Sequence, residues 1–219
     1  MKKIVSILGC GWVGKALKVS FSSNFVLKCA SRDVELNKLS NFYTCDVLVI
    51  AIPARDFYIN VIKDVFLHIK KETKVILLSS ISFYNKKSLV VEAEKIVNQN
   101  SKNYVILRLG GLMGYDRIAG KYTGGKTILN TKTNYVHRDD VVGIIKMVIE
   151  KEINYNIFDV VAPIQCSKKE LFAQNGQKFG FEKTYFEENR CKERQISADK
   201  IVIDLGYNFL REDVAKFWD

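Results

Sequence analysis

The chain has 219 residues, of which 47% are hydrophobic, which is enough to bury one substantial core. Its 34 lysines and arginines outnumber its 24 acidic residues, for a net charge of +10. The lysines are scattered in pairs, with no stripe of aromatic residues between them, a pattern that favours a solvated surface and disfavours a nucleic-acid-binding face. No apolar stretch approaches the roughly 18 residues of a membrane span, and the first is too short for a signal peptide. We therefore expect a cytoplasmic protein.

The cysteines provide no framework for a metal or for disulfides. Cys10, Cys29, Cys45, Cys166 and Cys191 form no C-x-x-C pair, and their number is odd. We therefore expect reduced, mostly buried thiols and no metal site.

The strongest motif lies near the N-terminus, where an apolar strand pattern over residues 4–8 runs into the turn Gly9-Cys10-Gly11-Trp12-Val13-Gly14. This is a G-x-G-x-x-G spacing, and an amphipathic helical run follows it. The first glycine lets the backbone turn sharply, the second lets a pyrophosphate approach the main chain, and the third lets the next helix pack on the strand. The sequence predicts a dinucleotide-binding turn in which Gly9, Gly11, Trp12, Val13 and Gly14 hold the pyrophosphate at the helix N-terminus.

A second strand, over residues 25–30, ends at Ser31, Arg32 and Asp33. An acidic residue about 20 positions past the glycines binds the ribose of NAD, whereas an arginine there accommodates the 2′-phosphate of NADP. Ser31 and Arg32 therefore favour NADP, and Asp33 would favour NAD if the strand ended later. Residues 33–45 are few for a further helix and strand, so this part of the fold looks shortened.

Strands and helices then alternate along the chain. Apolar runs predict strands at 46–52, 74–78 and 104–109, and helical periods at 57–69 and 89–97 separate them. This alternation predicts an α/β fold, a doubly wound, mostly parallel Rossmann sheet with its ligand crevice at the carboxyl ends of the strands. We assign the middle portion of the cofactor to the end of the third strand, at Ala51, Ile52 and Pro53.

The alternation of apolar strands and helices ends at Gly110. A glycine-rich polar loop runs to Asn134, and a helix begins near Asp139 and Asp140, either of which could cap it, and ends near residue 151. A late strand, a helix capped by Ser167 and two short helical pieces complete the chain. We expect a single domain over residues 1–219, with a core over about 1–135 and small C-terminal, substrate-covering elements over about 136–219.

Four further segments follow the glycine turn: a serine-rich strand end, a strand leading into a glycine loop, a His-x-Asp-Asp helix start, and a late strand with a capped helix. They are Leu78–Tyr84, Leu107–Gly114, Val136–Val142 and Ile157–Leu171. In this order, over nearly the whole chain, they resemble the extended short-chain dehydrogenase/reductases of the NAD-dependent epimerase/dehydratase type, in particular their atypical, shortened members. The resemblance implies a nicotinamide cofactor and a polar, sugar-like substrate.

The chain departs from this family at one motif. The family carries a Tyr-x-x-x-Lys pair on the helix after the serine-rich strand, and no such pair occupies that helix here. Only Tyr122 has a lysine four residues later, Lys126, and both lie in the glycine-rich loop, where no helix would fix their geometry. Because proton transfer requires held geometry, we do not assign catalysis to this pair.

Other side chains could take over the proton chemistry. Ser80 matches the family's active-site hydroxyl, although a serine there could equally bond its own backbone; Ser79, beside it, is assigned to the cofactor. Tyr84 could present its phenol to the same crevice if a cationic neighbour such as Lys86 or Lys87 were held near it.

Three basic residues remain as candidates. His137 is a natural proton-transfer residue, but its place before a helix favours a role in orienting the loop. Arg108 and Arg138 could clamp a phosphate or carboxylate, or could simply pair with Asp139 or Asp116.

Residues 120–127 satisfy the Walker-type spacing G-x-x-x-x-G-K-T. A phosphate-binding loop of that kind must link a buried strand directly to a helix, yet the nearest strand ends about ten residues upstream and the residues after Thr127 are not helix-forming. A substrate loop is the better interpretation.

The sequence thus predicts an NAD(P)-dependent oxidoreductase or epimerase/dehydratase-like protein that acts by hydride transfer on a polar metabolite, such as a sugar or nucleotide-sugar, with Ser80, Tyr84 and His137 as catalytic candidates. The alternative is a non-catalytic NADP(H)-binding sensor or regulatory partner. The oligomeric state is left open.

Overall fold

The computed structural model describes residues 2–31, 41–188 and 196–219. The chain forms two compact units, one from Met1–Arg108 with Val142–Phe158 and the other from Leu109–Val141 with Asp159–Asp219. The expected division near residue 135 stays a prediction.

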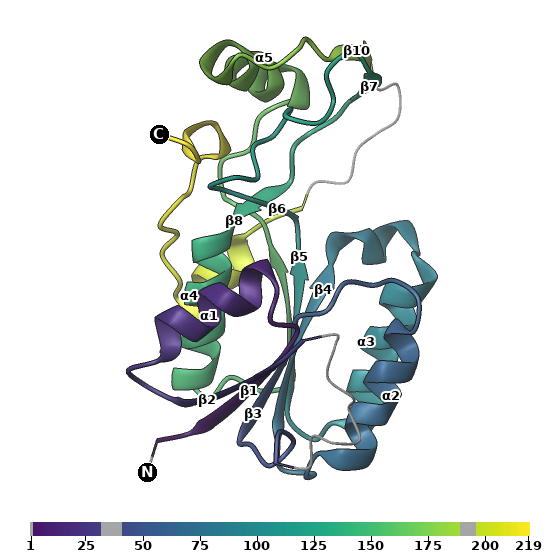
Figure 1. Ribbon diagram of the computed structural model, residues 1–219, viewed down its shortest axis with the longest axis vertical. Helices are drawn as coiled ribbons and strands as arrows, with labels where there is room; N and C mark the ends of the chain where they lie inside the picture. Colours follow the sequence, from purple (N-terminus) through teal and green to yellow (C-terminus); the bar gives the residue numbers. More distant parts are fainter. Residues whose placement is uncertain (1, 32–40, 189–195) are drawn as a thin grey trace. The chain divides into compact units, whose positions relative to one another are not determined.

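The first unit is built around a six-stranded sheet (Figure 1), whose strands in spatial order are β2 (Val26–Ala30), β1 (Ile4–Leu8), β3 (Val47–Ile50), β4 (Lys74–Ser80), β5 (Tyr104–Leu109) and β9 (Asn156–Val160). β1 pairs in parallel with β2 and β3, and β3 pairs in parallel with β4. All four residues of β3 are buried, as a strand covered on both faces requires. The mostly parallel α/β sheet expected from the sequence is confirmed.

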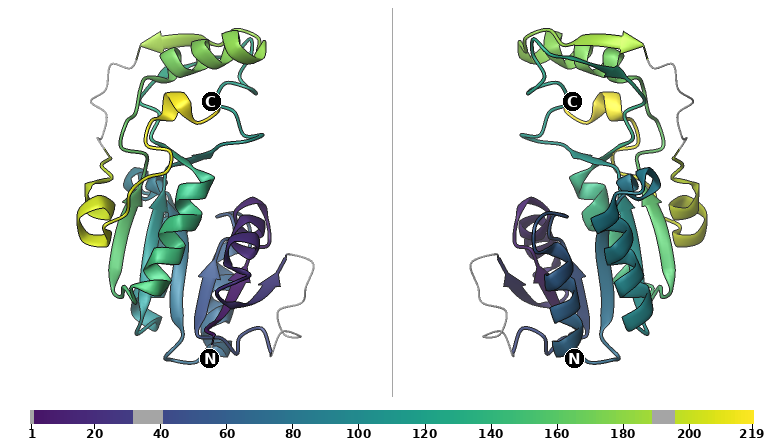
Figure 2. Two further views of the ribbon diagram at one scale, coloured as in Figure 1. Left: turned by 90° about the vertical axis from the view of Figure 1, so that its left-hand side faces the viewer. Right: turned by 90° about the vertical axis from the view of Figure 1, so that its right-hand side faces the viewer.

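Helices cover both faces of this sheet. α2 (Tyr58–His68) and α3 (Ser88–Asn100) lie on one face, and α1 (Trp12–Phe21) and α4 (Arg138–Glu150) lie on the other (Figures 1 and 2). The sheet is therefore doubly wound. In the described part of the chain, every helix is too short or too polar to span a bilayer.

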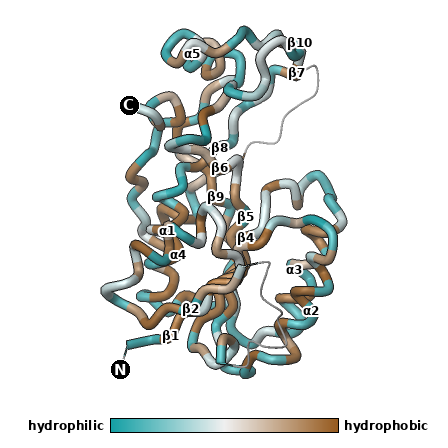
Figure 3. Tube along the Cα trace, viewed as in Figure 1, coloured by the Kyte–Doolittle hydropathy of each residue, from teal (hydrophilic) through white to brown (hydrophobic). Residues whose placement is uncertain are grey.

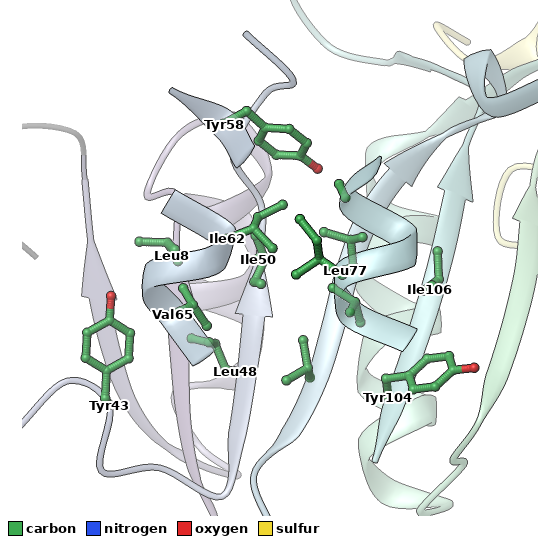
Figure 4. Close-up of a cluster of buried hydrophobic side chains, with 14 of the residues drawn as sticks. Leu8, Tyr43, Leu48, Ile50, Tyr58, Ile62, Val65, Leu77, Tyr104 and Ile106 are labelled. Atoms are coloured by element: carbon green, nitrogen blue, oxygen red, sulfur yellow. The ribbon is translucent and has the colours of Figure 1, made fainter. Parts of the chain in front are cut away.

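The core of the first unit forms where an apolar stripe of α2 meets the sheet. Ile62 and Val65 of α2, Leu48 and Ile50 of β3, and Leu77 of β4 are fully buried in one cluster (Figure 4). Full burial of each such side chain contributes about 1.5–3 kcal/mol relative to exposure. The strands of the sheet are among the more hydrophobic segments of the chain (Figure 3).

The strand order changes direction between β1 and β3, because β2 continues from β1 on one side and β3 lies on the other. In open α/β sheets, ligands bind beyond the carboxyl ends of the strands at such a switch point. The backbone N–H of Ala51, just after β3, donates to the carbonyl of Leu8 at 2.7 Å. The fold thereby places the turn after β1 beside the turn after β3.

The second unit contains two small parallel sheets. β6 (Gly111–Met113) pairs with β8 (Tyr135–His137), and β7 (Thr127–Asn130) pairs with β10 (Tyr185–Glu188). The expectation of one continuous loop from 110 to 134 is therefore wrong. Strands of three or four residues leave too little periodicity to identify, and their partners are distant in sequence.

Helix α5 (Lys168–Phe179) begins as the sequence predicts. The Ser167 hydroxyl accepts from the backbone N–H of Glu170 at 3.1 Å, and the Glu170 carboxylate accepts from the backbone N–H of Ser167 at 2.9 Å. This reciprocal capping box satisfies two backbone donors, which confirms Ser167 as the cap. Short helical turns follow at Ile201–Leu205 and Val214–Lys216.

The start of α4 corrects another expectation. The Asp140 carboxylate accepts from the Tyr207 hydroxyl and from the backbone N–H groups of Leu210 and Arg211, and so holds the C-terminal segment. The Asp139 carboxylate accepts from the hydroxyl of Tyr115 at 2.6 Å. Because α4 begins at Arg138, both aspartates lie within its first turn, and neither is the residue that precedes the helix.

Candidate functional site

Two of the three motif glycines are required by the packing of the chain itself. Gly9 has φ +110°, and a Cβ there would lie 2.6 Å from the carbonyl oxygen of Ala51. A Cβ on Gly14 would lie 2.2 Å from the carbonyl oxygen of Gly9. Any side chain at these two positions would force the turn or α1 away from the sheet. Their close packing matches the roles of the first and third glycines in a dinucleotide-binding turn.

Gly11 is different, because no described atom beyond its two chain neighbours would lie within 4 Å of a Cβ built on it. It is exposed and stands at the N-cap of α1, where none of the described side chains caps the helix. The positive end of the helix dipole and the backbone N–H groups of the first turn favour an anion at this place. The second glycine of the motif thus opens toward solvent where a pyrophosphate would approach. Trp12 is partly buried beside it, and Val13 packs in the core.

A cavity of about 430 Å³ adjoins this turn within the first unit. Of the predicted cofactor residues, Gly9, Ser31, Ile52 and Pro53 line it. The cavity lies beyond the carboxyl ends of β1, β2 and β3, at the switch point of the sheet. Arg32, the residue that favours NADP, lies outside the described residues.

The cavity also has a lining that sequence reasoning missed. Arg55, Asp56 and Phe57 contribute to it just before α2. Phe57 is 77% exposed and has φ 65°, a left-handed conformation that is strained for a phenylalanine. Such strain is concentrated at binding sites. The only sequence signal was the position of these residues directly after Pro53.

The expectation of reduced thiols is wrong for two of the cysteines. Cys10, inside the glycine turn, forms a disulfide with Cys29 of β2, with a Cα–Cα distance of 5.8 Å. The pairing arises because Ile7 of β1 is in register with Cys29, so the turn after β1 folds back over the end of β2. A count of cysteines cannot reveal such a pair. Cys45 and Cys166 are free.

A second polar cluster lies at the end of β4. The Arg108 guanidinium donates to both carboxylate oxygens of Glu94 at 2.8–3.1 Å, and the Ser79 hydroxyl donates to the same carboxylate at 2.5 Å. The side chains of Arg108 and Glu94 are only 11% and 5% exposed. Arg108 therefore pairs with Glu94 of α3 rather than with Asp116 or Asp139. Ser79 is directed into this pair.

Arg108 also reaches Tyr84. Its Nη1 donates to the Tyr84 hydroxyl oxygen at 3.2 Å, and its Cζ lies 3.5 Å from the centre of the Phe83 ring. The cation that holds the phenol is thus Arg108, whereas Lys86 and Lys87, suggested by the sequence, are exposed. A guanidinium held in this way fixes the position of the phenol oxygen.

Ser80 has a structural role. Its hydroxyl oxygen accepts from the backbone N–H of Ser82 at 3.1 Å and caps the short helix Ile81–Asn85. A hydroxyl that accepts one hydrogen bond still carries a hydrogen that it can donate. The cap therefore holds Ser80 in place, and its hydroxyl can still donate a hydrogen bond.

His137 belongs to the second unit and is 2% exposed. Its Nδ1 accepts from the backbone N–H of Asp139 at 3.3 Å, and its ring contacts those of Tyr115 and Phe217. Burial lowers the pKa of His137, against the opposing effect of the Asp139 charge. The neutral imidazole orders the start of α4.

Arg138, another candidate clamp, lies with its Cζ 4.2 Å from the Tyr115 ring centre and forms an ion pair with Asp139 at 3.7 Å.

The Walker-type segment leads into strand β7 at Thr127, not into a helix. It therefore lacks the strand-loop-helix arrangement of a phosphate-binding loop. Lys126 donates to the backbone carbonyl of Tyr122 rather than to its phenol, and Tyr122 is 74% exposed. The described residues contain no group of three or more His, Cys, Asp or Glu that could hold a metal ion.

No family model matches the chain. Protein YeeZ of Escherichia coli K12 is 24% identical, over 97% of each chain. A proposed NAD-dependent epimerase/dehydratase from Methylobacillus flagellatus superposes with a TM-score of 0.81 at 15% identity, over 99% of this chain and 96% of that one. This chain therefore has the fold of the epimerase/dehydratase and short-chain dehydrogenase/reductase structures that it matches. MoeE5, solved with UDP-glucose and NAD, also matches, with a TM-score of 0.75 at 13% identity over 97% and 95% of the two chains. The resemblance expected from the sequence is confirmed for the fold.

Proposed function

We propose that this chain binds a nicotinamide dinucleotide at the turn Gly9–Gly14 and acts by hydride transfer on a polar, sugar-like metabolite, as an NAD(P)-dependent oxidoreductase or epimerase-like enzyme. The observation that carries the proposal is the contrast among the three glycines. Contacts within the chain explain why Gly9 and Gly14 are glycines. Gly11, by contrast, faces open space at the N-terminus of α1, which no described side chain caps. A ligand that approaches the main chain explains Gly11.

The residues around the turn fit such a cofactor. The backbone from Gly9 to Gly14 would hold the pyrophosphate, and Ser31 with Arg32 would hold the adenosine ribose, with Arg32 favouring NADP. Phe57, exposed at the cavity, offers an aromatic face to the adenine. Ala51, Ile52 and Pro53 would line the path toward the nicotinamide, which supplies or accepts a hydride when bound.

The chain's own side chains would position the reacting oxygen. Ser80, held by its bond to the N–H of Ser82, would donate its hydroxyl hydrogen to a substrate carbonyl or alcohol. Tyr84, fixed by Arg108, would exchange a proton with the same oxygen in place of the missing Tyr-x-x-x-Lys pair. His137 is retained as a further candidate for proton transfer.

The substrate class rests on the fold. MoeE5 was solved with UDP-glucose and NAD, so a sugar or nucleotide-sugar is the first substrate class to test. The net charge of +10 favours an anionic ligand such as a nucleotide-sugar.

Calorimetric titration of the purified chain with NADPH, NADH and ATP tests the cofactor. We expect both dinucleotides to bind and ATP to bind much more weakly. Arg32→Ala should weaken NADPH much more than NADH, since only NADPH carries the 2′-phosphate. Equal losses would refute the 2′-phosphate assignment, and failure of both dinucleotides to bind would refute the proposed function.

A second candidate is a non-catalytic dinucleotide-binding sensor. It is favoured by the engagement of Ser79, Ser80 and Tyr84 in hydrogen bonds within the chain. Hydride transfer from NADPH to a panel of nucleotide-sugar carbonyl compounds, followed spectroscopically, separates the two. Turnover that Ser80→Ala and Tyr84→Phe abolish supports the enzyme, and tight dinucleotide binding without turnover supports the sensor.

A further inference from the structure

The disulfide between Cys10 and Cys29 lies inside the proposed cofactor turn. We propose that these two cysteines form a reversible redox pair and that oxidation, by fixing the turn, strengthens dinucleotide binding. The effect on binding rests on the proposed function, whereas formation of the bond does not.

The backbone brings the two residues together independently of the bond. The N–H groups of Gly9 and Cys10 both donate to the carbonyl of Ala30, at 2.9 and 3.2 Å, so the turn is already attached to the end of β2. The Cα–Cα distance of 5.8 Å lies in the middle of the range that disulfides adopt, roughly 4.4–6.8 Å. Backbone hydrogen bonds thus hold the two residues at a separation that suits a disulfide.

The pair differs from the other described cysteines in its electrostatic surroundings. Cys10 and Cys29 are partly exposed, as Cys166 also is, but Cys10 directly precedes Gly11 at the positive end of the α1 dipole. That end favours a negatively charged sulfur. Burial, by contrast, raises the pKa of Cys45 and of Cys166, which keeps those thiols protonated. We therefore assign Cys10 as the thiolate that reacts first.

Hydrogen peroxide is the oxidant that completes the reaction. The Cys10 thiolate attacks one peroxide oxygen, the O–O bond breaks, and a sulfenic acid forms while the other oxygen leaves as water after protonation. The Cys29 thiolate then attacks the sulfenic sulfur, and the S–O bond breaks with loss of a second water. Two thiols and one peroxide thus become one disulfide and two waters. A small dithiol reverses the step by thiol–disulfide exchange.

The consequence for the cofactor follows from the residues on each side of Cys10. Gly9 and Gly11 give the turn more conformational freedom than any other residue type would. The disulfide restricts this freedom while leaving Gly11 facing open space. A preformed site loses less entropy on binding, so the oxidised chain should bind NADP⁺ about three- to tenfold more tightly than the reduced chain.

The first experiment tests the bond alone. The chain is reduced with dithiothreitol, treated with stoichiometric hydrogen peroxide, and its free thiols are counted after denaturation. We expect five thiols before oxidation and three after, with the new disulfide mapped to Cys10 and Cys29 by mass spectrometry, and recovery of five after reduction. Cys166→Ser, the matched control, should still lose two thiols, whereas Cys29→Ser should form no disulfide at Cys10. A disulfide that maps elsewhere, or none, overturns the proposal.

The second experiment tests the effect on binding. NADP⁺ is titrated against the oxidised and the reduced chain, and against the Cys10→Ser/Cys29→Ser variant in both redox states. We expect the affinity difference in the wild-type chain and in Cys166→Ser, and its loss in the double variant. Equal affinities in the two wild-type states would overturn the link to binding. If NADP⁺ binds neither state, the proposed function fails, and the thiol count alone decides the redox pair.

Discussion

The turn after β1 and the end of β4 belong to the same compact unit, and both carry residues that the sequence singles out, yet their polar groups are used differently. At the turn, Gly11 opens toward solvent, and none of the described side chains caps α1. At the end of β4, Ser79, Ser80 and Tyr84 all make hydrogen bonds within the chain.

The difference teaches which kinds of residue point to a ligand. No side chain of the described residues fills the space at Gly11, so an external ligand can approach its backbone. A serine that caps a helix, or a tyrosine held by a buried arginine, is explained by the fold alone. The case for cofactor binding is therefore stronger than the case for any particular catalytic residue.

Loss of the buried ion pair should have the largest effect. Arg108→Met leaves the Glu94 carboxylate buried without its cation and should reduce the free energy of unfolding by about 3–5 kcal/mol. Lys63→Met, which breaks the exposed Lys63–Glu92 pair, should change it by less than about 1 kcal/mol. Urea denaturation measures both. If both variants lost only about 1 kcal/mol or less of the free energy of unfolding, the Arg108–Glu94 pair would not be an important source of stability.

The motif glycines should separate stability from binding. Gly14→Ala places a methyl group 2.2 Å from the Gly9 carbonyl oxygen and should cost about 3 kcal/mol of stability. Gly11→Ala meets no described atom within 4 Å other than those of its chain neighbours and should lower stability by about 1 kcal/mol or less, the cost of alanine in place of glycine at an N-cap. It should still weaken NADPH binding at least about tenfold, equivalent to about 1.4 kcal/mol, because the methyl group occupies the approach of the pyrophosphate. Undiminished binding by Gly11→Ala would remove the main support for the cofactor site.

Ser80 offers a smaller and more diagnostic effect. Ser80→Ala removes the cap of the helix Ile81–Asn85 and should lower stability by about 1 kcal/mol. Thermal unfolding measures this loss, and a hydride-transfer assay on the folded variant measures turnover. If stability falls while turnover is unchanged, Ser80 is a structural cap only.

The smallest expected effect concerns pH. Burial lowers the folded-state pKa of His137 below its usual value near 6.5, so the unfolded chain takes up a proton at a higher pH than the folded one. The contribution of His137 to stability should be fully present above about pH 6.5 and lost as the pH falls through the folded pKa. The difference between the wild-type chain and His137→Gln in urea denaturation from pH 7.5 to 5 isolates it, with His68→Gln as the control. A difference that does not change with pH would contradict this prediction.

The sequence alone determined the features that arise within a few neighbouring residues. The glycine turn after β1, the alternation of strands and helices, and the helix cap at Ser167 were all predicted, because the spacing of apolar residues, glycines and caps encodes them locally.

Only the tertiary structure decided the partners that lie far apart in the chain. The pairing of Arg108 with Glu94, the disulfide between Cys10 and Cys29, and the cavity that Phe57 lines each join segments brought together by the sheet order. No local pattern specifies such contacts, because they depend on which strands become neighbours when the core is buried. For the same reason the sequence did not reveal that Arg108, rather than Lys86 or Lys87, is the cation beside Tyr84.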